Sequence, residues 1–112
     1  MKIAIPTEGN NLEDKIALHF GRAKHFLVYD TEKNKFEIYS NPEAEKIPVL
    51  PPDFLKKLGV EAVICFSLGL PAFNLFKNYK IETKKATKGS IKENINLFLE
   101  NKLRDLTQQD IF

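Results

Sequence analysis

The chain has 112 residues, of which 43% are apolar and 29% are charged, and its formal net charge is +2. These values are typical of one globular domain over residues 1–112, and they exclude a largely disordered chain or a strongly basic nucleic-acid-binding protein. The single cysteine, Cys65, excludes an internal disulfide and a metal site built from several thiolates of one chain. No apolar run approaches the ~20 residues that cross a bilayer, and no secretory signal is evident. We therefore expect a cytoplasmic protein without a membrane partner.

The first forty residues predict three strands. Residues 2–6 hold three consecutive apolar side chains followed by a proline, which is typical of a short buried strand. Residues 25–30 and 36–40 are rich in β-branched and aromatic types, and the polar stretch 31–35 between them predicts a β-hairpin.

The middle of the chain predicts alternating helices and strands. Residues 41–52 hold four of the six prolines and predict a connecting loop, followed by a short helix that ends at Gly59. Residues 60–66 predict a buried strand, and Pro71 is typical of the first turn of a second helix. Residues 81–86 predict a fifth, more polar strand.

The last helix has the clearest local signal. Ser90 and Glu93 form a capping box, in which each side chain satisfies a backbone donor at the start of a helix. Apolar residues continue at helical spacing as far as Leu106, and we expect residues 101–112 to be a helical tail that frays. The element order is therefore βββαβαβα, an α/β fold whose alternating units require right-handed crossovers and helices on the sheet faces.

Residues 19–26 are the most informative stretch for function. They place the ring of His19, a glycine at position 21 and the cations Arg22 and Lys24 just before a predicted strand. Gly21 permits a turn that a residue with a Cβ would resist, and such a turn would present His19 and nearby N–H groups to a ligand. The alternative is that Gly21 only turns the chain and that both cations are solvated.

The His-Phe-Gly-Arg-Ala motif at 19–23, the opening Lys-Ile-Ala-Ile-Pro and a later Gly-Val-x-x-Val-Ile resemble one known family. It is the dinitrogenase iron–molybdenum cofactor biosynthesis family, which includes small cofactor carriers of nitrogenase assembly, and the resemblance covers roughly residues 1–100. It implies a three-layer α/β/α fold of ribonuclease H-like topology, with a five-stranded mixed sheet in which one strand is antiparallel. It also implies binding of an iron–sulfur-type cluster or iron–molybdenum cofactor precursor, with metallocluster donor and acceptor proteins as partners.

The resemblance also identifies candidate site residues. His19 matches the motif histidine and would supply an imidazole to iron, while Arg22 would offset the negative charge of a cluster. Gly69 matches a glycine of the family's strand–helix turn, where Ser67 also lies and where N–H groups at a helix start favour anions. If the strand order of the family holds, Gly21 and its neighbours face this turn across the carboxyl edge of the sheet.

Two further residues allow more than one interpretation. Cys65 lies within a predicted buried strand, so it is either an inert buried thiol or, if it turns toward the pocket, a second metal ligand beside His19. His25 begins a strand and is expected to be structural or exposed.

The main alternative is a protein-interaction or regulatory module of the same fold that binds no cofactor. Many relatives carry a glycine- and histidine-rich loop before the first helix, whereas residues 43–52 contain neither type. Such a module would dock through a lysine-rich edge, although these lysines also suit an edge strand that avoids aggregation. The lysines are Lys77, Lys80, Lys84, Lys85, Lys88 and Lys92.

Catalysis and nucleic-acid binding are not indicated. The chain has no P-loop, no Gly-x-Ser-x-Gly motif and no clustered carboxylates on its predicted strands, so we expect no enzyme. The lysines have no accompanying ladder of aromatic side chains, so we expect no nucleic-acid partner. We expect a monomer or a weak homodimer.

Overall fold

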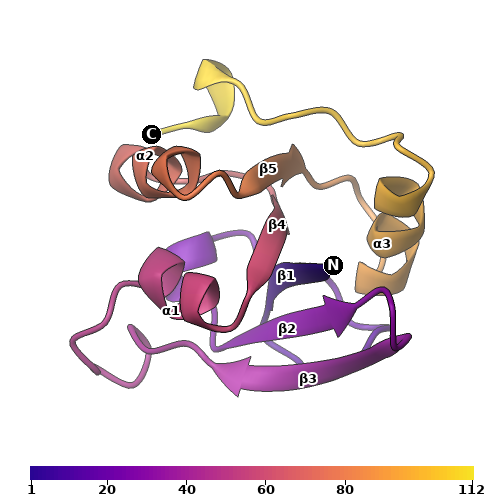
Figure 1. Cartoon of the computed structure of the whole chain (residues 1–112), viewed down its shortest axis with the longest axis horizontal. Coiled ribbons are helices and arrows are strands. Elements are labelled where there is room, and N and C mark those ends of the chain that lie inside the picture. Colours follow the sequence, from indigo (N-terminus) through magenta and orange to yellow (C-terminus); the bar gives the residue numbers. More distant parts are fainter.

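Five strands form one mixed sheet in the computed structural model, which describes residues 1–112 (Figure 1). The strands are β1 (Lys2–Thr7), β2 (His25–Asp30), β3 (Lys35–Ser40), β4 (Val60–Cys65) and β5 (Glu82–Lys85). Their order across the sheet is β3-β2-β1-β4-β5. β2 is antiparallel to β1 and β3, whereas β1, β4 and β5 run parallel. The predicted five-stranded mixed sheet with one antiparallel strand is confirmed.

The helices lie on both faces of the sheet. They are α1 (Pro51–Lys57), α2 (Leu70–Asn78) and α3 (Ile91–Leu99), and short 3-10 turns occur at Phe20–Arg22 and Gln108–Asp110. Leu55 of α1 and Phe76 of α2 belong to one buried apolar cluster, and Ile95 of α3 belongs to a second. The predicted three layers and the element order are thus confirmed. None of the helices is long and apolar enough to span a membrane.

The ends of the helices follow local sequence signals, with one shift. α1 begins at Pro51, which the sequence had placed in the preceding loop; a proline fits a first helical turn because its missing N–H has no partner there anyway. Gly59 follows α1 with a φ of 83°, a left-handed conformation that favours glycine. The predicted capping box of Ser90 and Glu93 is present at the start of α3.

The predicted extension of the last helix to Leu106 is wrong, because α3 ends at Leu99. Asn101 adopts a left-handed φ of 59°, and the Lys102 N–H donates to the Leu97 carbonyl at 2.9 Å, which closes the helix end. Leu106 is buried without being helical. An extended segment that is buried along its length can show apolar residues at the same spacing as a helix. The spacing of Leu106 therefore did not reveal which of the two structures it belongs to.

Residues 102–112, called the C-terminal segment below, are hydrogen-bonded and largely extended, with one 3-10 turn at Gln108–Asp110, rather than a frayed helix. They run from α3 back along β5 to a position beside α2 (Figure 1). The Lys85 N–H donates to the Arg104 carbonyl at 2.8 Å and the Leu106 N–H to the Thr83 carbonyl at 3.0 Å. This segment therefore covers the outer edge of β5.

Candidate functional site

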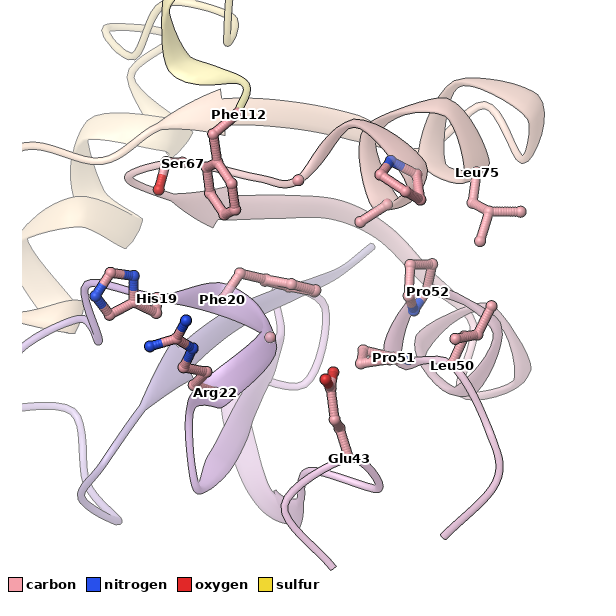
Figure 2. Close-up of a pocket in the computed structure, with 14 residues that line it drawn as sticks. His19, Phe20, Arg22, Glu43, Leu50, Pro51, Pro52, Ser67, Leu75 and Phe112 are labelled. Carbon is pink, nitrogen blue, oxygen red and sulfur yellow. The ribbon is translucent and has the colours of Figure 1, made fainter. Parts of the chain in front are cut away.

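A cavity of about 610 Å³ opens beyond the carboxyl ends of β1 and β4 (Figure 2). Because these two strands are parallel neighbours, the segments that follow them leave the same edge of the sheet. The five predicted cofactor-binding residues all line this cavity: His19, Gly21, Arg22, Ser67 and Gly69. The structure thus brings together two segments more than forty residues apart, and the role of these residues stays a prediction.

One wall of the cavity is the 3-10 turn at residues 20–22. The Phe20 side chain is only 4% exposed, and its ring centroid lies 5.1 Å from that of Phe26 and 5.6 Å from that of Phe76. Burial of this ring fixes the turn and leaves His19 and Arg22 exposed on it. Neither exposed side chain forms a hydrogen bond or ion pair within the chain, so both are available to a ligand.

Asn41 holds the same turn in place through side-chain hydrogen bonds, and the sequence analysis missed it. Its buried side-chain amide donates to the Gly21 carbonyl at 3.2 Å and to the Ala23 carbonyl at 2.9 Å. Its side-chain oxygen accepts the Glu43 N–H at 3.0 Å. Asn41 therefore positions both the turn and Glu43, a role that an asparagine before a proline in a predicted loop does not reveal.

The structural reason for a glycine at position 21 differs from the predicted one. The left-handed glycines of the chain are Gly59 and Gly89, so the turn at Gly21 does not depend on a conformation that favours glycine. A Cβ at Gly21 would instead lie 3.4 Å from Oε2 of Glu43. The absence of a side chain at this position therefore leaves space in the cavity.

The opposite wall is the loop between β4 and α2. Gly69 is extended there, with φ −69° and ψ 153°, and Ser67 is half-buried. The sequence predicted free N–H groups at the start of α2, but the Leu70 N–H donates to the main-chain oxygen of Phe112 at 3.0 Å. One of the donors expected for an anion is therefore already bonded to the C-terminal segment.

The cavity also has an apolar end that the sequence analysis missed. Figure 2 shows Leu50, Pro52 and Leu75 at one end, His19 and Arg22 at the other, and Glu43 between them. Glu43 is the only acidic side chain among the lining residues. The apolar end is formed by the proline-rich segment at the start of α1 and by one face of α2. These two parts come together only through the packing of α1 against α2, which the sequence does not reveal.

Cys65 does not line the cavity, so its predicted role as a second metal ligand is not supported. The residue is 1% exposed and lies in the apolar cluster between the sheet and the layer of α1 and α2. Burial raises the pKa of the Cys65 thiol to about 12, whereas metal binding requires the thiolate. The other predicted residue, His25, is half-buried with Nδ1 3.0 Å from the Gly9 carbonyl oxygen, which suits a structural role.

The lysine-rich edge is partly neutralised by the C-terminal segment. Lys84 Nζ lies 2.7 Å from Asp105 and Lys85 Nζ lies 3.1 Å from Asp110. β5 is an edge strand of the sheet, as predicted, but the C-terminal segment pairs with its outer side. This arrangement leaves fewer free cations for docking than the sequence indicates.

Comparisons with known proteins give a consistent picture. A family model described as dinitrogenase iron-molybdenum cofactor matches residues 1–101. An uncharacterized protein of Methanocaldococcus jannaschii is 36% identical over 110 residues, covering 92% of this chain and 89% of that protein. The NMR structure of a Thermotoga protein, provisionally described as a NifB protein, is 30% identical with a TM-score of 0.81, covering 96% and 94% of the two chains. The apo orange protein of Desulfovibrio gigas shares the fold, with a TM-score of 0.84 and 21% identity over 95% of this chain and 92% of that chain.

Proposed function

The chain belongs to the dinitrogenase iron-molybdenum cofactor family, and from this we propose that it is a carrier or accessory domain rather than an enzyme. Its cargo is an iron–sulfur-type metallocluster or an iron–molybdenum cofactor precursor, and its partners are the proteins that donate and accept that cluster. One observation carries the proposal. His19 and Arg22, exposed and without partners in the chain, share a cavity of about 610 Å³ with Ser67 of a distant segment.

The donor set of the cavity fits a preassembled cluster better than a bare metal ion. No group of three or more histidine, cysteine, aspartate or glutamate side chains is placed to hold a metal ion. A bare ion would need about four to six ligands from the protein or from water. A cluster brings its own bridging sulfides and needs few protein ligands. The cavity volume also lies within the range of about 300–1,000 Å³ that is usual for small-molecule sites.

Each polar residue of the cavity has a distinct role in this proposal. The His19 imidazole donates a nitrogen lone pair to iron. The Arg22 guanidinium offsets the negative charge of the cluster and donates hydrogen bonds to its sulfides. The Ser67 hydroxyl donates a further hydrogen bond from the opposite wall. One bond to metal supported by hydrogen bonds permits release, which a carrier requires.

Anaerobic reconstitution with ferrous iron and sulfide tests the proposal. We expect the wild-type protein to retain iron and sulfide through gel filtration and to show visible charge-transfer absorbance. His19→Ala should reduce retention about tenfold or more, since a metal ligand is lost, and Arg22→Gln should reduce it less.

His25→Ala is the matched control, because it removes the only other histidine, which lies outside the cavity. This variant should retain the cluster at the wild-type level. Equal losses in the two histidine variants would contradict the assignment of His19. If the wild-type protein retains no iron, the proposal fails and the cofactor-free interaction module takes its place.

A further inference from the structure

The C-terminal segment lies beyond the residues that match the family model, yet its last residue lines the cavity. We propose that Phe112 is a specificity-determining residue, whose ring closes one side of the cavity and favours anionic ligands with an apolar or polarisable face. This inference rests on the proposed function, because it assigns the ligand class of the same cavity.

The main chain around Phe112 is held firmly against the β4–α2 loop. The Phe112 N–H donates to the Leu68 carbonyl, and the Leu70 N–H donates to the main-chain oxygen of Phe112, both at 3.0 Å. The Leu68 N–H in turn donates to the Asp110 carbonyl at 3.2 Å. Three hydrogen bonds therefore fix this end of the segment to the loop that carries Ser67 and Gly69.

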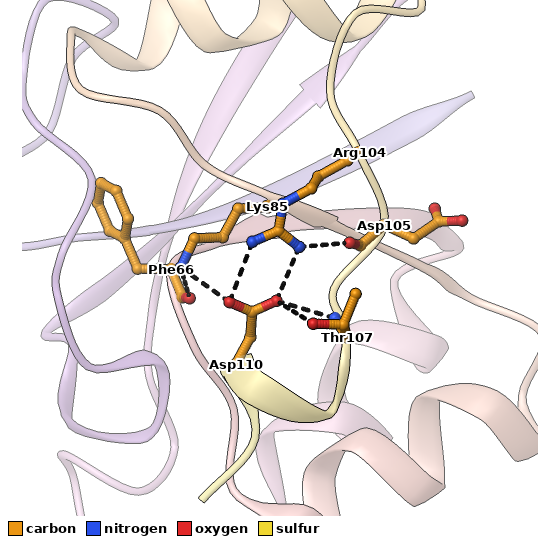
Figure 3. Close-up of polar contacts among 6 residues, drawn as sticks. All are labelled: Phe66, Lys85, Arg104, Asp105, Thr107 and Asp110. Atoms are coloured by element: carbon orange, nitrogen blue, oxygen red, sulfur yellow. Dashed lines mark hydrogen bonds and ion pairs between the residues drawn. The ribbon is translucent and has the colours of Figure 1, made fainter.

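A cluster of charged groups around Asp110 secures the same segment (Figure 3). Its carboxylate, 7% exposed, accepts hydrogen bonds from both terminal nitrogens of Arg104 at 2.9 and 3.3 Å and from the Thr107 N–H at 2.8 Å. Lys85 Nζ lies 3.1 Å from the carboxylate and donates to the Phe66 carbonyl at 2.7 Å. These contacts, called the Asp110 cluster below, tie the segment to both β5 and the β4–α2 loop.

The ring of Phe112 is exposed although its main chain is fixed. The residue is 77% exposed, and Cε2 of its ring lies 3.7 Å from the position that a Cβ on Gly69 would occupy. Figure 2 shows the ring extending from the side of Ser67 toward Phe20. A ligand that enters the cavity would cover this apolar surface, and burial of a phenyl ring is favourable. Arg22 and His19 at the polar end add a preference for negative charge.

Two probes test this inference with different ligand chemistry. The first is 8-anilinonaphthalene-1-sulfonate, an apolar anion whose fluorescence rises in an apolar site, and the second is the reconstituted iron–sulfur cluster. Phe112→Ala should weaken binding of the sulfonate about five- to tenfold, which corresponds to the lost burial of part of one ring. The same variant should lose cluster iron to a chelator about fivefold faster.

Phe36→Ala is the matched control, because Phe36 is a partly exposed phenylalanine of β3 outside the cavity. It should change both measurements less than twofold. Asp110→Asn, which loosens the segment but keeps the ring, should act in the same direction as Phe112→Ala with a smaller effect. Thermal unfolding of Phe112→Ala should change by less than about 2 °C, since the side chain is exposed.

The outcomes separate this inference from the proposed function. Binding of both probes by Phe112→Ala at or above the wild-type affinity would overturn the role of Phe112. A loss of sulfonate binding in Phe112→Ala, together with a wild-type protein that retains no cluster, would support Phe112 as the cavity wall and overturn the cluster as its cargo.

Discussion

Two walls of the cavity are held in place by different forces. The turn at residues 20–22 is held by the buried ring of Phe20, which packs against two other aromatic rings of the core. The C-terminal segment is held near Phe112 by the Asp110 cluster and by main-chain hydrogen bonds to the β4–α2 loop. One wall is thus held by aromatic packing, whereas the other combines Leu106, which belongs to the same core cluster as Phe20, with a polar anchor at Asp110.

This difference has consequences for how each wall responds to change. Apolar burial depends on area and is nearly independent of pH, whereas charge-assisted hydrogen bonds weaken when the carboxylate is protonated. The wall with His19 should therefore move only when the protein unfolds. At the wall with Phe112, neutralising Asp110 should loosen the end of the segment while Leu106 and the sheet stay packed.

The largest expected effect comes from removing the aromatic anchor. Phe20→Ala should lower the free energy of unfolding by about 3–5 kcal/mol, because it leaves a cavity next to Phe26 and Phe76. Urea denaturation followed by circular dichroism measures this loss. Phe36→Ala, at a position that is 36% exposed, should cost less than about 1 kcal/mol. Equal losses at the two positions would show that the turn is not anchored in the core.

A smaller effect is expected from the polar anchor. Asp110→Asn should lower the free energy of unfolding by about 2 kcal/mol at pH 7, since it removes the charge that Arg104 and Lys85 share. Asp105→Asn is a matched control from the same segment, whose carboxylate is 75% exposed and pairs only with Lys84. Its cost should be about 0.5 kcal/mol. A larger loss for Asp105→Asn than for Asp110→Asn would contradict the assignment of the anchor.

The pH dependence of this effect has a definite sign. Hydrogen bonds from Arg104 and the Thr107 N–H hold the pKa of Asp110 well below its ordinary value of 3.8. A lowered folded pKa adds stability above the unfolded pKa, and that stability is lost as pH falls through the folded pKa. The difference between wild type and Asp110→Asn should therefore stay constant from pH 7 to about 5 and shrink below about pH 4. Denaturation curves at pH 7, 5 and 3 check this course.

The sequence predicts the fold well because most of its signals are local. The strand boundaries agree to within one residue, and the capping box at Ser90 and the stop at Gly59 act within one turn of a helix. The error at the end of α3 has a physical cause. An extended segment that crosses an edge strand buries Leu103 and Leu106 at spacings that also suit a helix.

The candidate site is predictable only in part. The topology implied by the resemblance correctly placed the His19 turn opposite the loop at Ser67, because parallel neighbouring strands share an edge. Glu43 and the Phe112 wall were missed, since their positions depend on hydrogen bonds to residues far away in the sequence. Asn41 contacts Gly21 across twenty positions, and Asp110 contacts Lys85 across twenty-five. A pattern within a short stretch of sequence does not predict such long-range contacts.

The smallest expected effect concerns the polar end itself. Glu43→Gln should strengthen binding of an anionic ligand about two- to threefold, because Glu43 is the only acidic side chain in the cavity and repels negative charge. Sulfonate titration at low and high salt measures the change, which should diminish as salt screens the carboxylate. Glu45→Gln, an exposed residue of the same loop outside the cavity, should have less effect.

Cluster retention by Glu43→Gln separates two roles for this carboxylate. If Glu43 only repels the cargo, its neutralisation should slow the loss of iron to a chelator, in parallel with the tighter sulfonate binding. If iron is lost faster while the sulfonate binds more tightly, the carboxylate is itself a ligand to iron. The polar end would then hold its cargo by two bonds, from His19 and from Glu43, and release would require breaking both. Because Asn41 accepts the Glu43 N–H and donates to the Gly21 carbonyl, one buried amide would then position both ligand-bearing segments.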